Sequence, residues 1–452
     1  MSFNNETICA LATPNAIGAI AIVRVSGKNA KEIVSDYFSK NLRDKASHTT
    51  HFGLFKNDSG ETIDEVLATV FDTGKSFTGE ESVEISCHGS PYIQQQIIQT
   101  LTQKNCRLAE PGEFTKRAFM NGKLDLSQAE AVADLIASQS KQAHQIALRQ
   151  LRGNFSHELK DLREKLIHFA SLIELELDFA EEDVEFADRS QLKELVAEVL
   201  RIVNRLAQSF ALGNALKNGV PVAIVGAPNT GKSTLLNQLL GEDRAIVSNI
   251  AGTTRDVIEE TLNIDGILFR LIDTAGIRET TETIEALGIE RSQQKIEQAS
   301  IVLCMADANN SENLKEVQSW QKMLQEKYPE KSILLIVNKV DIHEIQLPES
   351  IAISAKNGTG IETLKSKLVE LIVGSFDLQN ETIVANARHH EALLKTAKAL
   401  EKAQYDLDHG TTGDFIAMDI REAMRQLGNI TGEIQIDKDI LGNIFERFCI
   451  GK

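Results

Sequence analysis

One eight-residue segment of the chain has the composition and spacing of a phosphate-binding loop. Residues 226–233 read GAPNTGKS, match G-x-x-x-x-G-K-[ST], and lie between an apolar run, Val220–Val225, and a helical run, Thr234–Leu240. Glycines let backbone N–H groups turn toward phosphate oxygens, and the helix N-terminus adds partial positive charge. We therefore expect Lys232 to reach the outer phosphates of a nucleotide and the Ser233 hydroxyl to ligate Mg²⁺. An ordinary glycine turn is the alternative.

Two further segments have the residues needed to sense a γ-phosphate. Residues 273–276, DTAG, follow the predicted strand Leu268–Ile272, where an Asp can hold Mg²⁺ through water and the Gly276 N–H can meet the phosphate. Residues 248–256, SNIAGTTRD, lie between the two motifs, and we assign Thr254 as the residue that completes the Mg²⁺ shell. A plain polar loop is the alternative for 248–256.

A third motif indicates which base is recognised. Residues 338–341, NKVD, follow the apolar strand that ends at Val337, and 354–356, SAK, follow the next predicted strand. The Asp341 carboxylate can accept two hydrogen bonds from the N–H edge of guanine, whereas adenine would leave it unpaired, a mismatch worth roughly 10⁴ in discrimination. The order of the four motifs predicts GTP rather than ATP.

These motifs predict a GTP site made of Asn229, Thr230, Gly231, Lys232, Ser233, Thr234, Ser248, Asn249, Ile250, Ala251, Gly252, Thr253, Thr254, Asp273, Thr274, Ala275, Gly276, Asn338, Lys339, Asp341, Ser354, Ala355 and Lys356.

The position directly after DTAG lacks the side chain that orients the attacking water in Ras-like enzymes. Those enzymes place a Gln there, whereas this chain has Ile277, which has no polar side-chain atom. Hydrolysis must therefore use another group or be slow. The nearby charged candidates are Glu279, Glu282, Glu285, Arg255 and Arg278.

The elements that position these motifs fall into three types of pattern. Residues 1–118 alternate strand and helix signals, which indicates a small α+β domain. Residues 119–217 and 376–452 have helical periodicity, and residues 218–375 alternate apolar strands with amphipathic helices, as in a mostly parallel sheet covered on both faces. The simplest topology is an α/β domain inserted into one helical domain, within a multidomain α+β and α/β chain.

Composition excludes several classes of protein. The chain of 452 residues is 42% hydrophobic and 25% charged, which are ordinary globular values. Its formal charge of −17 divides into −2 for 1–118, −7 for 218–375 and −8 for the rest. A protein that coats nucleic acid through its net field is disfavoured, because phosphate neutralisation needs clustered Lys and Arg.

The cysteines favour a reducing compartment. Their number is odd, at five, and no CxxC pair occurs. Without a signal-like N-terminus or an apolar stretch long enough to span a membrane, we predict a cytoplasmic protein. Cys87 and His88 are adjacent on a predicted strand and should point to opposite faces, so they should not act together. Cys449 is either a buried thiol on a docked terminal helix or a nucleophile.

Several segments resemble the MnmE (TrmE) family of tRNA-modification GTPases over nearly the whole chain. They are IVRVSG around Arg24, SFTGEESVEISCHGS at 76–90, PGEFTKRAFMNGKLDL at 111–126, APNTGKST, IAGTTRD, DTAGIRE and the terminal FCIGK. The GTPase motifs alone would fit many families. The N-terminal segments together with FCIGK are specific.

The resemblance implies an N-terminal tetrahydrofolate-binding and dimerisation domain at 1–118, a helical domain at 119–217 and 376–452, and an inserted Ras-like P-loop GTPase domain at 218–375. It implies a homodimer that works with the FAD-dependent MnmG protein, in a heterotetramer or larger complex. Together they would add an aminomethyl or carboxymethylaminomethyl group to C5 of the wobble uridine of certain tRNAs. The implied one-carbon donor is a tetrahydrofolate derivative, in the 5-formyl or methylene form.

The resemblance also implies roles for several residues whose side-chain type alone does not indicate a function. Arg24, Glu84, Lys123 and Lys452 match the family's folate-site residues. Asn229 matches its K⁺-binding Asn, and Ser248, Ile250 and Thr253 match the loop that caps this ion, although the family more often has Thr at the position of Ser248. Glu285 matches the Glu that positions the attacking water, beside Lys232 in catalysis, and Cys449 matches the family's C-terminal Cys.

Two functions remain open at this stage. One is the GTP-hydrolysing subunit of a tRNA-modifying complex, and the other is a GTPase that acts as a binding switch in ribosome assembly. The GTPase motifs fit both. The second class usually carries an appended RNA-binding module with a basic face, and none is evident in this sequence.

Overall fold

A computed structural model describes residues 6–178, 189–243, 260–272, 293–343, 345, 347–374, 376–378 and 381–432. The chain divides into two compact units, which are described separately below. One contains residues 1–136, 149–187 and 411–452, and the other contains residues 137–148 and 188–410. This division cuts the helical region, so the predicted domain boundaries at 118, 217 and 375 stay predictions.

The first unit contains a six-stranded sheet in the order β3-β4-β5-β2-β1-β6. Its strands are β1 (Thr7–Leu11), β2 (Ile20–Ser26), β3 (Thr49–Lys56), β4 (Thr62–Phe71), β5 (Ser82–His88) and β6 (Cys106–Leu108). Neighbouring strands are antiparallel except β1 and β6. Helices α1 (Ala30–Tyr37) and α2 (Pro91–Thr102) share a core with one face.

Strand β1 is buried on both faces of the sheet, because its successive side chains point to opposite sides. Cys9 belongs to the core beneath α1 and α2, whereas Ile8 and Ala10 pack with Phe114 of α3 (Glu113–Met120). Successive strand residues point to opposite faces, so a single strand can serve two helical layers. The α+β prediction for this region is confirmed.

Strands β1, β3 and β6 of this sheet were not predicted, and the last two have little strand signal in the sequence. β6 has only three residues, one of them Arg107, and is recognisable only because it pairs in parallel with β1. β3 carries polar Thr49, Thr50 and His51 at its start, so it lacks a continuous apolar signal. Both become strands because their neighbours supply hydrogen-bonding partners, which is tertiary context acting over local propensity.

The second unit contains a six-stranded sheet in the order β12-β11-β10-β7-β9-β8. Its strands are β7 (Val220–Gly226), β8 (Glu260–Ile264), β9 (Ile267–Leu271), β10 (Ile301–Asp307), β11 (Ser332–Asn338) and β12 (Ser350–Ile353). All neighbours are parallel except β8 and β9, which form a hairpin. The hairpin turns at Asp265-Gly266, both with positive φ, as two-residue turns of this kind require.

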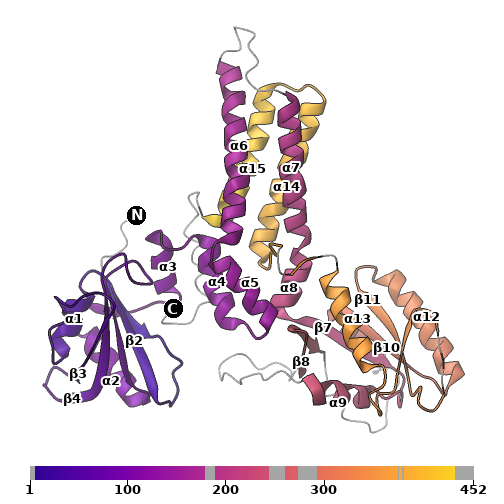
Figure 1. Ribbon diagram of the computed structural model, residues 1–452, viewed down its shortest axis with the longest axis horizontal. Coiled ribbons are helices and arrows are strands. Elements are labelled where there is room, and N and C mark those ends of the chain that lie inside the picture. The colour runs from indigo at the N-terminus through magenta and orange to yellow at the C-terminus, as the bar shows by residue number, and fades with distance from the viewer. Residues whose placement is uncertain are drawn as a thin grey trace. The chain divides into compact units, whose positions relative to one another are not determined.

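Helices cover both faces of this sheet, as predicted (Figure 1). Along β7, Val222 and Ile224 enter one core with the helices α9 (Lys232–Asp243) and α13 (Ile361–Val373). Ala223 and Val225 enter the other core with α12 (Ser311–Lys327). β7 is therefore buried on both sides, which places the loop after it at the carboxyl edge of the sheet, where ligands bind in such folds.

The remaining helices are α4 (Leu126–Ala137), α5 (Lys141–Leu151), α6 (Asn154–Asp178), α7 (Arg189–Gln208), α8 (Phe210–Asn218), α14 (Ala387–Asp408) and α15 (Gly413–Thr431). α15 packs along α6 in the first unit, and α14 packs along α7 in the second, so each pair joins helices from before and after the second sheet. An α/β domain inserted into a split helical region is thereby confirmed as the fold class. In the described part of the chain, none of the helices is long and apolar enough to cross a membrane.

The segment that leads into the second sheet and the segment that leaves it are held together by side-chain contacts. Arg205 of α7 forms a bidentate ion pair with Glu381, at 2.8–3.1 Å. The Ser209 hydroxyl accepts the Val384 N–H at 3.0 Å. Gly213 is needed here, since a Cβ at this position would lie 2.2 Å from the Val384 carbonyl oxygen. The entry and the exit of the inserted domain therefore form one joint.

Candidate functional site

The phosphate-loop sequence forms the strand–loop–helix unit that its motif predicts. β7 ends at Gly226 and α9 begins at Lys232. Between them, Asn229 has a φ of 63° and Gly231 a φ of 95°, both in the left-handed region. Gly231 cannot be replaced without strain, because a Cβ there would lie 2.2 Å from the side-chain nitrogen of Asn338.

The Lys232 ammonium group is turned back over the loop that it follows. It donates hydrogen bonds to the carbonyl oxygens of Gly226 at 2.9 Å and Ala227 at 2.7 Å. Burial lowers the pKa of Lys232, and the positive charge of Lys295 lowers it further. A cation held against backbone carbonyls in this way gains from an incoming polyanion, which would replace weak dipoles with full negative charge.

Asn338 connects three of the predicted motifs through its buried carboxamide. Its Nδ2 donates to the Thr230 carbonyl oxygen at 2.8 Å, and its Oδ1 accepts the Ala355 N–H at 2.9 Å. Asn338 is 3% exposed and ends β11. Its amide is thus committed to the phosphate loop on one side and the 354–356 loop on the other. The sequence alone marked Asn338 as part of the site but did not reveal this bridging role.

The base-recognition segments lie next to each other because β11 and β12 are parallel neighbours. Val340 N–H donates to the Ile353 carbonyl oxygen at 3.3 Å, and Ser354 N–H donates to Thr359 at 2.9 Å. Asp341 is exposed, whereas Ser354 is fully buried. The Asp341 carboxylate is therefore available to a ligand beside the backbone of 354–356, and the tight Ser354 turn holds that backbone in place.

The described structure thus brings together residues 229–234, 338–341 and 354–356. The other predicted nucleotide, metal, catalytic and C-terminal residues lie outside the described residues: Ser248, Asn249, Ile250, Ala251, Gly252, Thr253, Thr254, Arg255, Asp273, Thr274, Ala275, Gly276, Ile277, Arg278, Glu279, Glu282, Glu285, Cys449 and Lys452.

Three of the predicted folate residues gather around one loop of the first unit. Arg24 and Glu84 are register partners on β2 and β5, and the Arg24 Nε and Nη2 both bond the same Glu84 oxygen, at 2.9 and 2.8 Å. The Arg24 guanidinium lies 5.4 Å from the ring centre of Phe77, a residue of the loop 72–81. Lys123 donates to the Gly74 carbonyl of the same loop at 2.9 Å.

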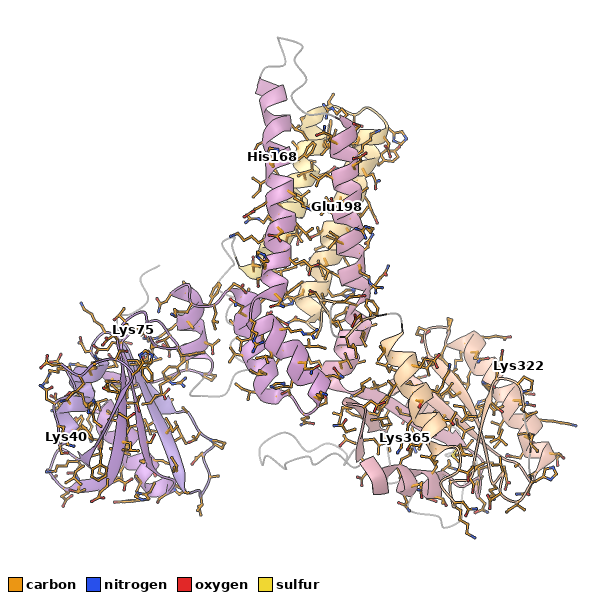
Figure 2. All side chains as sticks on the ribbon, in the orientation of Figure 1. Lys40, Lys75, His168, Glu198, Lys322 and Lys365 are labelled. Carbon is orange, nitrogen blue, oxygen red and sulfur yellow. The ribbon has the colours of Figure 1, made fainter. Side chains whose placement is uncertain are left out.

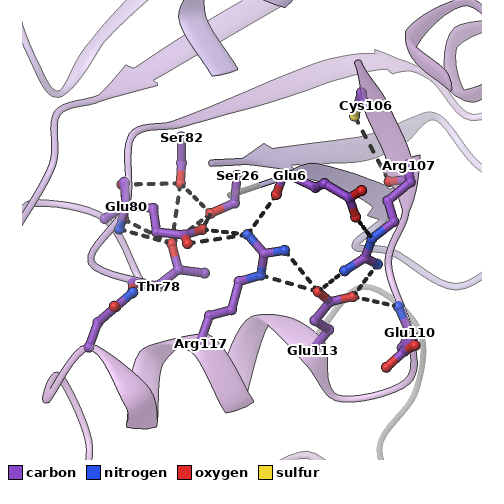
Figure 3. Close-up of polar contacts among 12 residues, drawn as sticks. Glu6, Ser26, Thr78, Glu80, Ser82, Cys106, Arg107, Glu110, Glu113 and Arg117 are labelled. Atoms are coloured by element: carbon purple, nitrogen blue, oxygen red, sulfur yellow. Dashed lines mark hydrogen bonds and ion pairs between the residues drawn. The ribbon is translucent and has the colours of Figure 1, made fainter. Parts of the chain in front are cut away.

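A partly buried ionic network that the sequence analysis did not identify holds this loop (Figure 3). Arg117 of α3 bonds Glu113 at 2.8 Å and Glu80 at 3.1 Å, and Glu113 also bonds Arg107 at 2.6 Å. Glu80 in turn accepts the Ser26 hydroxyl at 2.8 Å. The i,i+4 spacing of Glu113 and Arg117 in PGEFTKRAF is the one sequence signal of the network.

Electrostatics favour the ionised form of Glu113 despite its burial. Desolvation by itself would raise its pKa, but the hydrogen bonds from Arg107, the Glu110 N–H and Arg117 outweigh it and bring the pKa down to about 2. Because Glu113 is 4% exposed, loss of one arginine would leave its buried charge with a single cationic partner, which destabilises the fold. The network therefore fixes the loop that carries Phe77 and contacts Lys123.

Cys87 and His88 do not form a reactive pair, as predicted. Cys87 is buried, and burial with the nearby Asp64 charge raises the pKa of its thiol to about 11. His88 is exposed and bonds Asp64 at 2.7 Å. Among the described residues, Cys9, Cys87, Cys106 and Cys304 are free and buried.

Comparison with known families assigns most of the chain. Residues 7–123 match the family model described as "GTP-binding protein TrmE N-terminus", and residues 126–449 match "MnmE helical domain". The chain belongs to the MnmE (TrmE) family. The family resemblance drawn from the sequence motifs is confirmed.

Similar MnmE proteins extend over the same length. The chain is 53% identical over 473 aligned positions to the "tRNA modification GTPase MnmE" of Christiangramia forsetii, covering 99% of both chains. It is 52% identical over 470 positions to the protein of the same name from Flavobacterium johnsoniae, covering 99% of this chain and 100% of that one. Among solved structures, the G domain of the T. maritima FeoB iron transporter is 26% identical, at a TM-score of 0.26, over 33% of this chain and 97% of that one.

Proposed function

We propose that this chain binds and hydrolyses GTP and acts in tRNA modification. The observation that carries the proposal is the Asn338 bridge, which brings the phosphate loop and the 354–356 loop into one site next to Asp341. Membership of the MnmE family, with relatives named as tRNA modification GTPases, supports the same activity.

At finer detail, we propose that the chain helps add an aminomethyl or carboxymethylaminomethyl group to C5 of the wobble uridine. The donor would be a tetrahydrofolate derivative, and the FAD-dependent MnmG protein would be the partner of a homodimer in the cytoplasm. The cluster of Arg24, Glu84 and Lys123 supports folate binding: a carboxylate can pair with the N–H edge of a pterin, and cations can meet the glutamate tail. The net charge of −17 supports a partner that makes much of the tRNA contact.

The described residues fit the two proposed cations in their donor chemistry. Ser233 lies in the first turn of α9, directly after Lys232, and offers a hydroxyl oxygen beside the phosphate loop. Asn229 is exposed at a φ of 63° and offers a carboxamide oxygen. When bound, Mg²⁺ held by Ser233 and Thr254 would neutralise phosphate charge, and K⁺ held by Asn229, Ser248, Ile250 and Thr253 would add positive charge near the phosphates.

In hydrolysis, the chain's own groups have separate tasks. Lys232 would bind the outer phosphates, and the N–H groups of the loop would stabilise the charge that develops on them. Asp341 would orient the base. Glu285 would position the attacking water, the task that Ile277 cannot perform. Loop ordering around the nucleotide would bring the G domains of a dimer together, and hydrolysis would let them part.

The proposed function predicts folate binding by the purified chain. 5-Formyltetrahydrofolate should bind, and Arg24→Ala should weaken it by about 1.5–3 kcal/mol, roughly 10- to 100-fold, because a charge-assisted contact is lost. Isothermal titration of the full-length protein measures the affinity. Arg43→Ala is the matched control, since Arg43 forms an exposed pair with Asp36 at 2.9 Å on α1.

GTP hydrolysis without any folate binding would overturn the modification chemistry and favour the ribosome-assembly switch. Folate binding that Arg24→Ala leaves unchanged would instead move the site away from β2 and β5. GTP affinity should be the same in the Arg24→Ala variant, which separates the folate assignment from the nucleotide assignment.

The ion site predicts faster hydrolysis in K⁺ than in Na⁺. At equal ionic strength we expect at least about a tenfold difference, since a cation near the phosphates would partly replace an arginine finger, which raises the hydrolysis rate by about 10³–10⁵. Asn229→Ala should remove the difference. A distance probe on the G domains should show them approaching only with GTP and K⁺ together. Equal rates in both salts, with no nucleotide-dependent approach, would leave a mechanism that uses side chains alone.

A further inference from the structure

An aspartate at the end of β10 contacts the base-recognition motif from the neighbouring strand. Asp307 and Asn338 are register partners at the ends of β10 and β11. One residue further on, the Lys339 ammonium group donates to the Asp307 Oδ2 at 2.6 Å. The side chain of Asp307 is 19% exposed and that of Lys339 is 33% exposed, so the pair is partly shielded from water.

Asp307 is held in place by groups other than Lys339. Its Oδ1 accepts the Asn309 N–H at 3.0 Å and the Asn309 Nδ2 at 3.1 Å. The backbone N–H of Asp307 donates to the Oδ1 of Asn313 at 3.2 Å. Asn313 lies in the first turn of α12. The carboxylate is therefore a fixed acceptor, and the long side chain of Lys339 is the partner that it orients.

The backbone conformation of Lys339 links this ion pair to Asp341. Lys339 has a φ of 68°, a conformation that a long side chain adopts only when its surroundings impose it. The Asn338 amide holds the chain on one side of Lys339, and the Ala308 N–H donates to the Asn338 carbonyl at 2.9 Å. Asp341 follows two residues later. A shift at Lys339 would therefore be passed directly to the carboxylate that reads the base.

We propose that Asp307 is a positioning residue for guanine-nucleotide binding, which holds Lys339 so that its alkyl chain lines the base site and Asp341 keeps its orientation. The inference rests on the proposed GTP binding and adds a residue that none of the GTPase motifs contains. An ordinary surface ion pair would contribute little to nucleotide affinity, because both side chains would lose conformational entropy on pairing. Here one side chain is already fixed, so the ordering of Lys339 is achieved before the ligand arrives.

The test replaces the charge and keeps the shape. Asp307→Asn retains an oxygen for the Asn309 N–H and loses the ionic bond to Lys339. We expect the affinities for GDP and for a non-hydrolysable GTP analogue to fall equally, by about tenfold, which is about 1.4 kcal/mol. The equal loss follows because the pair lies at the base and not at the phosphates. Fluorescent-nucleotide titration of the full-length protein provides the measurement.

Glu362→Gln is the matched control. It breaks the 2.8 Å pair between Glu362 and Lys365 on α13, a short ion pair of the same unit at another helix (Lys365 is labelled in Figure 2). Nucleotide affinity should not change in this variant. A loss in both variants would show a general effect of removing acidic groups and would overturn the proposal.

A double-mutant cycle decides whether Asp307 acts through Lys339. In a Lys339→Met background, Asp307→Asn should have no further effect on affinity. Additive losses, or unchanged affinity in Asp307→Asn, would overturn the proposal. If Asp307→Asn does not fold, Lys339→Met breaks the same pair from its more exposed side, and unchanged GDP affinity there is equally decisive. Failure of the wild-type chain to bind guanine nucleotides would instead contradict the proposed function.

Discussion

Asp341→Asn is expected to change the preferred nucleotide from GTP to xanthosine triphosphate. Xanthine carries an oxygen where guanine has its exocyclic amine, and the Asn carboxamide can donate to that oxygen, whereas the Asp carboxylate only accepts. Because a polar mismatch at the hydrogen-bonding edge of a base costs about 10⁴ in discrimination, the ratio of the two affinities should change by a factor of this order. Competition binding with both triphosphates measures the ratio.

The structure provides a close control for this variant. Asp265→Asn makes the same chemical change in the turn between β8 and β9, at a φ of 51°, which Asn tolerates well. It should leave both affinities unchanged. Unaltered GTP affinity in Asp341→Asn would remove Asp341 from the base site. The backbone turn held by Val340 and Ile353 would then need another side chain to read guanine.

Lys232→Ala and Glu285→Ala should separate binding from turnover. Lys232→Ala should weaken GTP binding by about a hundredfold, since it removes a charge-assisted bond to phosphate worth about 3 kcal/mol. Glu285→Ala should bind GTP nearly as well as the wild type and lower the rate of hydrolysis by a factor of about 10² or more, because a water-positioning group acts only in the reaction. Nucleotide titration and single-turnover hydrolysis measure the two effects.

Each outcome points to a specific revision. If Glu285→Ala hydrolyses GTP at the wild-type rate, Glu279 or Glu282 becomes the candidate for positioning water. If Lys232→Ala retains tight GTP binding, the bonds of Lys232 to the Gly226 and Ala227 carbonyls are structural only, and the phosphates are bound by backbone N–H groups.

Much of the local structure could be predicted because it depends on short-range pattern. The apolar runs that form β7, β10 and β11 and the helix after the phosphate loop follow from periodicity within a few residues. The GTPase motifs likewise carry their chemistry in consecutive residues. The Asp265-Gly266 dipeptide is typical of a two-residue β-hairpin turn. A strand before it, β8, is therefore also predictable from the sequence.

Sequence alone was therefore sufficient for the class of the longer, strongly patterned elements, for the family and for the type of ligand. The tertiary structure decided which distant residues meet. Arg205 and Glu381 are 176 positions apart, and the Asn338 amide reaches Thr230 across 108 positions. The contacts of Asp307 with Lys339 and of Arg117 with Glu80 are equally invisible in one sequence. Local periodicity reports which face of an element is buried, but the partner on that face is set by the strand order and helix packing of the folded chain.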